Sequence, residues 1–290
     1  MLTAEWTHRL PFIQKKSPAE LATNLIIRTL DRVPNIDNSK FSIIDFCSGA
    51  GGPIPVIEKL VNAKRSEQGK TPIPFLLSDI QPHLDAWMNL AERSDNLSFV
   101  PQAVDATDPP IAVISTTSPL SSDPSSGFAS DTRVFRLYCL AFHHFDDELA
   151  KKVLQSTMAT ADGFAIIELQ DRRLWSLVLM VADFFLLFGV SIFWFWHDPL
   201  QLLLTYIIPA VPSICAFDGF ISSLRTREFD EVIGLIDVDA ADNVKYVVDQ
   251  EDTEVKRVEM NGWSFLGGRE MHSWPLGYMN YVVGQKIKST

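Results

Sequence analysis

Positive charge is scarce in this chain. Lys and Arg total 25 against 36 Asp and Glu, which gives a formal net charge of -11 over 290 residues. Nucleic-acid binding depends on clustered Lys and Arg that neutralise phosphates, so we expect no nucleic-acid partner. The amino terminus has no continuous apolar run ending in a cleavage site, so we expect no secretory signal.

Cysteine is also rare. Cys47, Cys139 and Cys215 are the only three, and they lie far apart in the sequence. This spacing is not that of a metal site, and an odd number suits a reducing compartment. We therefore predict no metal site, a cytoplasmic location, and cysteines that act as small buried apolar residues.

The most informative stretch is Phe41 to Gly52, where an apolar run reaches an acid, Asp45, and then a turn with three glycines. Such a run is typical of a parallel strand buried on both faces. Glycine in the turn lets backbone approach a ligand, and the helix that follows adds unpaired N–H groups. The turn does not end in Gly-Lys-Ser/Thr, so a nucleotide triphosphate loop is not predicted. The stretch predicts a cofactor cradle.

Two further apolar runs are each followed by acids. The run 74–78 ends at Asp79, and in doubly wound folds an acid at this strand tip accepts hydrogen bonds from ribose hydroxyls. The run 97–100 is followed by Asp105 and Asp108. Asp79 is therefore the predicted ribose ligand.

A fourth run, 134–140, precedes His143 and His144. Either histidine could remove a proton from a substrate; alternatively, one packs against the cofactor and the other caps the next helix. Adjacent side chains on an extended segment point to opposite faces, so the two are not expected to bind one metal. Glu168 ends the fifth run, 164–168, and its expected partner is Arg172 or Arg173.

The ordered set from Phe41 to Glu168 resembles the class I S-adenosylmethionine-dependent methyltransferases, with Asp45, Gly49 and Gly51 in register with their first motif. Cys47 stands where that family has its first glycine. The resemblance implies an α/β fold with a doubly wound, mostly parallel seven-stranded sheet. It also implies S-adenosylmethionine as cofactor, with Asp105 beside the adenine amino group or Asp108 in its place. The implied cofactor contacts are Asp45, Cys47, Gly49, Gly51, Asp79, Ile80, Asp105, Ala106 and Phe142.

An apolar region follows the fifth predicted strand. Residues 174–196 contain one charge, Asp183, and residues 200–217 contain none. As a helix of about 1.5 Å per residue the first run is long enough to cross a bilayer. Basic residues on both flanks would place both ends on the cytoplasmic side. We predict a two-helix insertion that either enters a membrane or forms a soluble lid over an apolar acceptor, the second favoured by Asp183.

These patterns divide the chain into an amino-terminal helical cap (1–40), a cofactor-binding core (41–173), the apolar helical hairpin (174–224) and the rest of the core (225–290). The segment 116–131 is rich in Ser, Pro and Gly and is predicted to be a flexible insertion. The leading hypothesis is methyl transfer to an apolar small molecule or lipid. The alternatives are a cofactor-binding fold used for another reaction, a non-catalytic membrane protein, or an NAD-dependent oxidoreductase.

Overall fold

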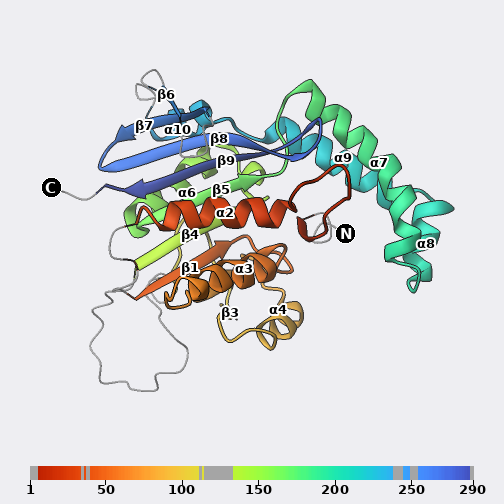
Figure 1. Ribbon diagram of the computed structural model, residues 1–290, viewed down its shortest axis with the longest axis horizontal. Coiled ribbons are helices and arrows are strands. Elements are labelled where there is room, and N and C mark those ends of the chain that lie inside the picture. Colours follow the sequence, from red (N-terminus) through yellow and green to blue (C-terminus); the bar gives the residue numbers. More distant parts are fainter. Residues whose placement is uncertain are drawn as a thin grey trace.

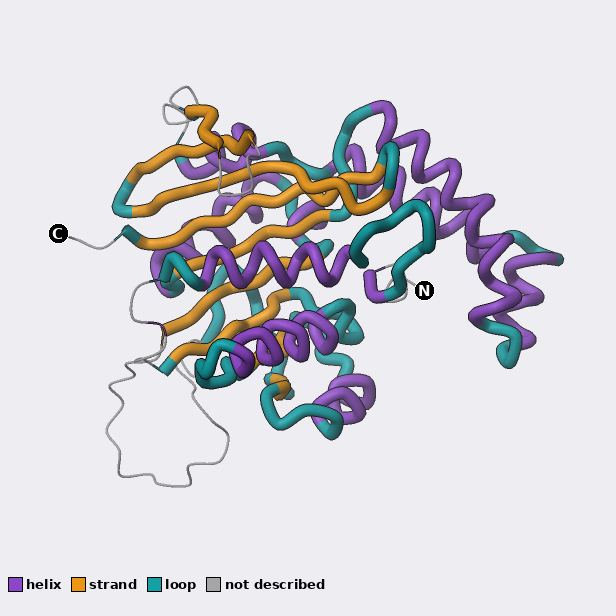
Figure 2. The backbone as a smooth tube through the Cα atoms, viewed as in Figure 1, coloured by secondary structure: helices purple, strands orange, loops and turns teal. Residues whose placement is uncertain are grey.

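The computed structural model describes residues 6–33, 36, 40–110, 113, 133–237, 244–248 and 254–287 (Figures 1 and 2). The predicted flexible insertion 116–131 lies outside the described residues. Within them, nine strands form one sheet in the order β3-β2-β1-β4-β5-β9-β8-β7-β6. The strands are β1 (Phe41–Phe46), β2 (Phe75–Ser78), β3 (Leu97–Phe99), β4 (Arg133–Cys139), β5 (Gly163–Glu168), β6 (Lys245–Val248), β7 (Glu254–Met260), β8 (Trp263–Ser273) and β9 (Gly277–Lys286).

Helices cover both faces of this sheet (Figure 1). The neighbouring strand residues Ile43 and Ile44 are both fully buried, yet they belong to two different apolar clusters, one on each face. The sheet is therefore doubly wound, as the continuous apolar runs predict. One face packs against α2 (Pro18–Leu30), α3 (Ile54–Glu67) and α4 (Leu84–Ala91), and the other against α6 (Asp147–Thr160) and α10 (Phe229–Ile236).

The strand directions define the fold class. β1 to β5 pair in parallel, and β9 lies antiparallel beside β5. This arrangement is a doubly wound α/β sheet in which five parallel strands continue into an antiparallel part. The carboxyl ends of β1 to β5 all meet at one edge of the sheet, where ligands of open α/β folds bind.

The prediction of seven strands was wrong. β6, β7, β8 and β9 form an antiparallel meander, which adds two strands beyond the expected closing hairpin. Asn261 and Gly262 join β7 to β8 with φ angles of 52° and 74°. Positive φ at both central residues is the type I′ turn that Asn-Gly favours between antiparallel strands. The local turn chemistry therefore extends the sheet.

The apolar region forms three helices rather than the two expected: α7 (Leu174–Trp194), α8 (Pro199–Tyr206) and α9 (Ala210–Arg225). We call them the arm, and they project from one end of the sheet (Figure 1). The second apolar run is broken because Pro209 has no N–H to donate and disfavours helix at the residue before it. At this break α8 and α9 are bent by 71°.

α7 is long and apolar enough to cross a membrane, and α8 with α9 could form a broken span. In the most apolar window of α7 only 17% of the residues are buried. The core helix of a soluble protein passes the same length test but is mostly buried. The arm therefore presents apolar side chains that the described part of the chain does not cover.

Candidate active site

The turn after β1 has a left-handed backbone at Cys47 as well as at its glycines. The φ angle is 61° at Cys47, 51° at Gly49 and 105° at Gly51. Glycine adopts such angles without cost, whereas other residues do so rarely. Cys47 thus keeps the backbone conformation that a glycine would have at this position. At Gly51 an added Cβ would lie 2.4 Å from Leu90 Cδ1, so this turn packs directly against α4.

Asp79 holds this turn in place. Its Oδ2 accepts a hydrogen bond of 2.8 Å from Gly49 N, and its Oδ1 accepts one of 2.9 Å from Gln81 N. Trp87 Nε1 donates to Gly49 O at 2.8 Å. A carboxylate has about four acceptor sites, so Asp79 retains capacity for a ribose hydroxyl while it orders the backbone. Its role as a ribose ligand remains a prediction.

Asp45 lies beneath the turn with 2% of its surface exposed. Its Oδ1 is buried and has no hydrogen-bond partner among the described residues. Burial raises the pKa of Asp45 well above its usual value, a hydrogen bond from Ser48 opposes this rise, and the charge of Asp79 adds to it. An unpaired buried carboxylate is costly, and the described residues supply no hydrogen-bond donor to this oxygen.

The carboxylates expected at successive strand tips surround Cys47. Burial raises the pKa of its thiol to about 12, with further contributions from the charges of Asp79, Asp45 and Asp105. Asp105 is exposed, and its Oδ1 accepts hydrogen bonds of 2.8 and 2.7 Å from the backbone and hydroxyl of Thr107. The structure thus brings Asp45 of β1 and the acids that follow β2 and β3 to one place.

The other expected cofactor contacts differ in exposure. Ile80 is 59% exposed beside Asp79, whereas Ala106 is buried and its carbonyl accepts a hydrogen bond from Arg136. Phe142 is 2% exposed and its ring packs edge-on against Tyr138. Ile80 is therefore free to contact a ligand, while the ring of Phe142 belongs to the core on the α6 side.

His143 forms a buried pair with Glu168 at the carboxyl ends of β4 and β5. His143 Nδ1 lies 2.8 Å from Glu168 Oε2, and His143 N donates to Glu168 Oε1 at 3.2 Å. This contact corrects the expected pairing of Glu168 with a neighbouring arginine: Arg172 pairs with Glu231 and Arg173 with Asp171. A carboxylate at Nδ1 favours the tautomer with the proton there, which leaves Nε2 as a proton acceptor.

The two histidine rings lie side by side, tilted by 39°, instead of pointing apart. They lie on a 3-10 turn, 142–144, and their ring centroids are 4.3 Å apart. The expectation of opposite faces was wrong because the segment is not extended. Neither histidine caps α6, whose amino end is capped by Asp146. Partial burial lowers the pKa of His144, and its neighbour His143 lowers it further.

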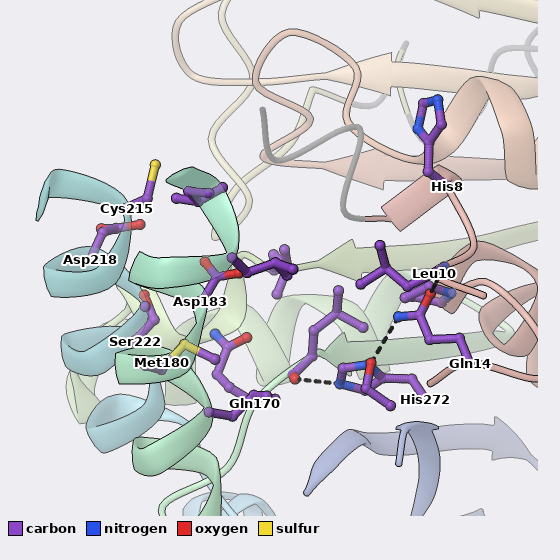
Figure 3. Close-up of a pocket in the computed structure, with 18 of the residues that line it drawn as sticks. His8, Leu10, Gln14, Gln170, Met180, Asp183, Cys215, Asp218, Ser222 and His272 are labelled. Carbon is purple, nitrogen blue, oxygen red and sulfur yellow. Dashed lines mark hydrogen bonds between the residues drawn. The ribbon is translucent and has the colours of Figure 1, made fainter. Parts of the chain in front are cut away.

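A cavity of about 230 Å³ lies between the arm and the edge of the sheet (Figure 3). His143 and His144 line it together with Leu140, the residue that follows β4. Leu140 has a φ of 51°, a second left-handed residue beside the turn of Cys47. The cavity therefore begins at the strand tip next to the predicted cofactor cradle, where an acceptor could meet a methyl donor.

The opposite wall of the cavity is held by a chain of hydrogen bonds (Figure 3). Gln14 Nε2 donates to Ser273 Oγ at 2.8 Å, Ser273 Oγ lies 2.9 Å from His272 Nδ1, and His272 Nε2 lies 3.1 Å from Leu169 O. Burial lowers the pKa of His272 to about 4, so its ring is neutral at pH 7. This network joins the amino-terminal segment to the ends of β5 and β8.

α7 and α9 each present two different faces. On α7 the cavity-lining residues recur every three or four positions, a stripe that includes Leu179, Asp183 and Val190. The other face carries Trp175, 59% exposed, and Phe185, 67% exposed. On α9 the lining residues are Cys215, Asp218, Gly219 and Ser222, and exposed residues include Ile214, Phe217, Ile221 and Leu224. The arm therefore covers a cavity with its inner face and exposes an apolar outer face.

Sequence reasoning missed the partners that shape this cavity. No sequence pattern predicts the pairing of Glu168 with His143. Gln14 and His272 were not considered, and neither belongs to a motif. Asp183 interrupts the apolar run and favours a lid, and its place on the inner stripe of α7 follows the helical period.

Comparison with known proteins gives structural matches only. A scan of protein-family models finds no match, and a search of curated proteins finds no sequence relative. Among solved structures, DszA carbon methyltransferase matches with 12% identity and a TM-score of 0.46 over 92% of this chain and 53% of its own. This chain thus spans about half the length of the DszA chain.

Two further structural matches are described as enzymes of different kinds. The plantazolicin methyltransferase BpumL, solved with a desmethylPZN analog and SAH, matches with 10% identity and a TM-score of 0.45 over 93% of this chain and 85% of its own. A Rhodobacter sphaeroides protein assigned to the zinc-dependent alcohol dehydrogenases matches with 11% identity and a TM-score of 0.40 over 99% and 97%. The function proposed below therefore rests on this chain's own residues.

Asp45→Asn should change how stability depends on pH. Burial raises the pKa of Asp45 in the folded chain, so the folded chain binds this proton more tightly than the unfolded chain. The free energy of unfolding therefore falls as the pH rises through the folded-state pKa. The asparagine does not titrate, so we expect its stability to fall less than that of the wild type as the pH rises above about 4, the ordinary pKa of an aspartate.

Urea unfolding at several pH values measures this difference. Asp85→Asn, which removes an exposed carboxylate on α4, is the matched control and should keep the wild-type slope. If the free energy of unfolding falls equally steeply with pH in the wild type and in Asp45→Asn, burial does not raise the pKa of Asp45.

Proposed function

We propose that the chain transfers a methyl group from S-adenosylmethionine to an apolar small molecule or lipid bound under the arm. The observation that carries this proposal is the junction of two sites at one sheet edge. The turn of Cys47 and the carboxylates around it form the donor site, and the cavity that begins at Leu140 forms the acceptor site. Facing the sheet edge, the arm would exclude water from the transfer.

The residues of the donor site fit S-adenosylmethionine. An added Cβ at Gly49 would meet no atom within 4 Å, so the turn has open space above its backbone. Asp45 has an unpartnered acceptor suited to the donor's ammonium group, and Asp79 has acceptor capacity for its ribose hydroxyls. Asp105, or Asp108 in its place, would face the adenine amino group, with Ile80, Ala106 and Phe142 as apolar contacts.

The cofactor, when bound, supplies an electrophilic methyl group on a sulfonium. Transfer forms a bond from the acceptor atom to that carbon, breaks the sulfur–carbon bond and leaves a neutral thioether. If the acceptor atom carries a hydrogen, its proton must be removed. His143 is the better placed base because Glu168 fixes its Nδ1 and leaves Nε2 at the cavity. His144 lies against its ring and is the alternative base.

Titration with S-adenosylmethionine tests the donor site. We expect the wild-type chain to bind it and Gly49→Ala to bind it at least about 10-fold more weakly, because the methyl group fills the space above the turn. Gly69→Ala is the matched control: its φ of 68° and the absence of atoms near an added Cβ resemble Gly49, but it lies after α3, away from the cradle. No binding to the wild type, or equal weakening by both variants, would contradict the assignment.

Methyl transfer itself tests the base. With S-adenosylmethionine and an extract of the source cells, we expect an acceptor to gain about 14 Da. For a hydroxyl acceptor, His143→Gln should lower kcat about 100-fold or more. Glu168→Gln should lower it less and shift the pH profile, because the ring loses its orienting carboxylate. If His144→Gln has the larger effect, His144 is the base instead.

We also propose that the outer face of the arm rests on a membrane on the cytoplasmic side. The inner face of α7 shares its cavity with Gln14 and His272 of the main body, so a position at the bilayer surface suits the arm better than a full crossing. Aromatic residues such as Trp175, Phe185 and Phe193 on its exposed face support this position. It would give apolar acceptors a direct route to the cavity.

Flotation with phosphatidylcholine vesicles tests this position. We expect the wild type to float and the variant Trp175→Gln/Phe185→Gln/Phe193→Gln to stay at the bottom. Each lost apolar contact costs about 1.5 kcal/mol or more, so partitioning should fall by about three orders of magnitude. Leu84→Gln/Met88→Gln/Leu149→Gln changes exposed apolar residues outside the arm and should still float. A wild-type chain that stays at the bottom would reject membrane binding and favour a soluble lid.

A further inference from the structure

The end of α9 contacts the turn that carries the two histidines. α9 ends at Arg225, and the chain then leaves the arm and enters α10 on the main body (Figure 1). We call residues 225–228 the α9–α10 linker and residues 142–145 the histidine turn. Among the described elements, α9 contacts the main body chiefly through the 3-10 helix at the start of this turn. The arm and the histidines therefore meet at the linker.

Arg227 of the linker holds the histidine turn by its backbone. Its Nη1 donates to Phe142 O at 3.3 Å, and its Nη2 donates to Phe145 O at 2.8 Å. The guanidinium carbon also lies 5.6 Å from the centroid of the Phe142 ring. Arg225 Nη2 donates to a third carbonyl oxygen, His144 O, at 2.9 Å. Two arginines of the linker thus bind the carbonyl groups on both sides of His143.

Burial decides which contacts of Arg227 matter. Its Nη2 also lies 2.8 Å from Asp147 Oδ1. The side chain of Arg227 is 10% exposed, whereas that of Asp147 is 80% exposed. An ion pair with so exposed a partner contributes little, because water screens it. A guanidinium that is removed from water needs acceptors for its N–H groups, so the contacts with the carbonyl oxygens are the ones that fix the turn.

The linker is itself fixed to both the arm and the sheet. Asn280 of β9 donates from Nδ2 to Arg227 O at 3.1 Å. Thr226 is 1% exposed, and its hydroxyl donates to Ser222 O at 2.9 Å. Ser222 lies on α9 and lines the cavity. A molecule in the cavity and the histidine turn therefore contact the same continuous stretch of chain.

We infer that Arg227 is a positioning residue for His143 and joins this proposed base to the arm. The inference rests on the proposed function, because it concerns the base of that reaction. Glu168 orients the ring of His143 at Nδ1, and Arg227 fixes the backbone that carries the ring. If the turn is released, His143 is still present but no longer held against the acceptor, and a displacement of about 1 Å can lower a rate about 100-fold.

Methyl transfer by Arg227→Met tests this role, because methionine is of similar length but donates no hydrogen bond. The rate is measured with a fixed amount of an extract of the source cells as the source of acceptor. At saturating S-adenosylmethionine we expect it to fall at least about 10-fold, with the KM for S-adenosylmethionine unchanged within about twofold. A rise in that KM as large as the fall in rate would show general disruption and overturn the inference.

A conservative variant and two controls isolate the carbonyl contacts. Arg227→Lys keeps the charge but lacks the planar fork that reaches two oxygens, so its rate should lie between those of the wild type and Arg227→Met. Asp147→Asn removes only the exposed ion pair. Arg172→Met removes an arginine that pairs with Glu231, beside the start of α7. Both controls should keep the wild-type rate, and an equal loss in either would overturn the inference.

Nitrogen-15 NMR of the His143 ring tests the inference without catalysis. In the wild type Glu168 holds the proton at Nδ1, so the two ring nitrogens should give well separated signals at about pH 8. Their loss in His143→Gln assigns them. The separation should shrink in Arg227→Met, because the released ring samples both tautomers, and stay unchanged in Arg172→Met. A separation that Arg227→Met leaves intact would overturn the inference.

The two measurements distinguish this inference from the proposed function. If the separation shrinks in Arg227→Met but the wild type transfers no methyl group, the positioning role stands and the proposed function falls. If the wild type and Arg227→Met transfer methyl groups equally fast, the proposed function stands and the positioning role falls. Circular dichroism checks that each variant is folded, and Arg227→Lys carries both tests if Arg227→Met is not.

Discussion

The parallel pairing of β1 with β4 is the constraint on which the rest of the structure depends. Because the two strands run side by side in one direction, the chain leaves both at the same edge of the sheet. Both exits pass through a non-glycine residue in the left-handed region, Cys47 after β1 and Leu140 after β4. Such a conformation costs about 1–2 kcal/mol per residue, and strained backbone of this kind clusters at functional sites. One exit leads to the cradle around Asp45, and the other leads to His143 and the cavity.

The arm covers this edge of the sheet. Its helices α7 and α9 are apolar on both faces, but the two faces have different surroundings. The inner stripes of α7 and α9 cover the cavity, and the helices approach closely: an added Cβ at Gly219 would lie 2.5 Å from Met180 Sδ. The outer stripes remain exposed. A soluble lid and a membrane surface element, which were rival interpretations of the sequence, are therefore compatible in one structure. Asp183 fits both, since it lies on the inner stripe that lines the cavity.

Much of the proposed donor site could be predicted from sequence. The apolar run ending at Asp45, the glycines after it and the acid at Asp79 follow local rules for strands, turns and strand tips. The count of strands could not be predicted in the same way, because the meander depends on long-range pairing, although Asn261-Gly262 was a usable local signal for its β7–β8 turn. The contact between the two histidine rings could not be predicted either, since a short 3-10 turn at 142–144 leaves no periodic pattern.

The sequence by itself determined the strand–helix alternation, the cradle turn and the apolar arm, because each depends on residues close together along the chain. Only the tertiary structure decided which side chains from distant parts of the chain meet. Glu168 pairs with His143 over 25 positions, and Gln14 reaches Ser273 over 259. It also decided which face of each arm helix turns inward. A helical period groups residues on a face, but when both faces are apolar only packing against the sheet edge selects the one that lines the cavity.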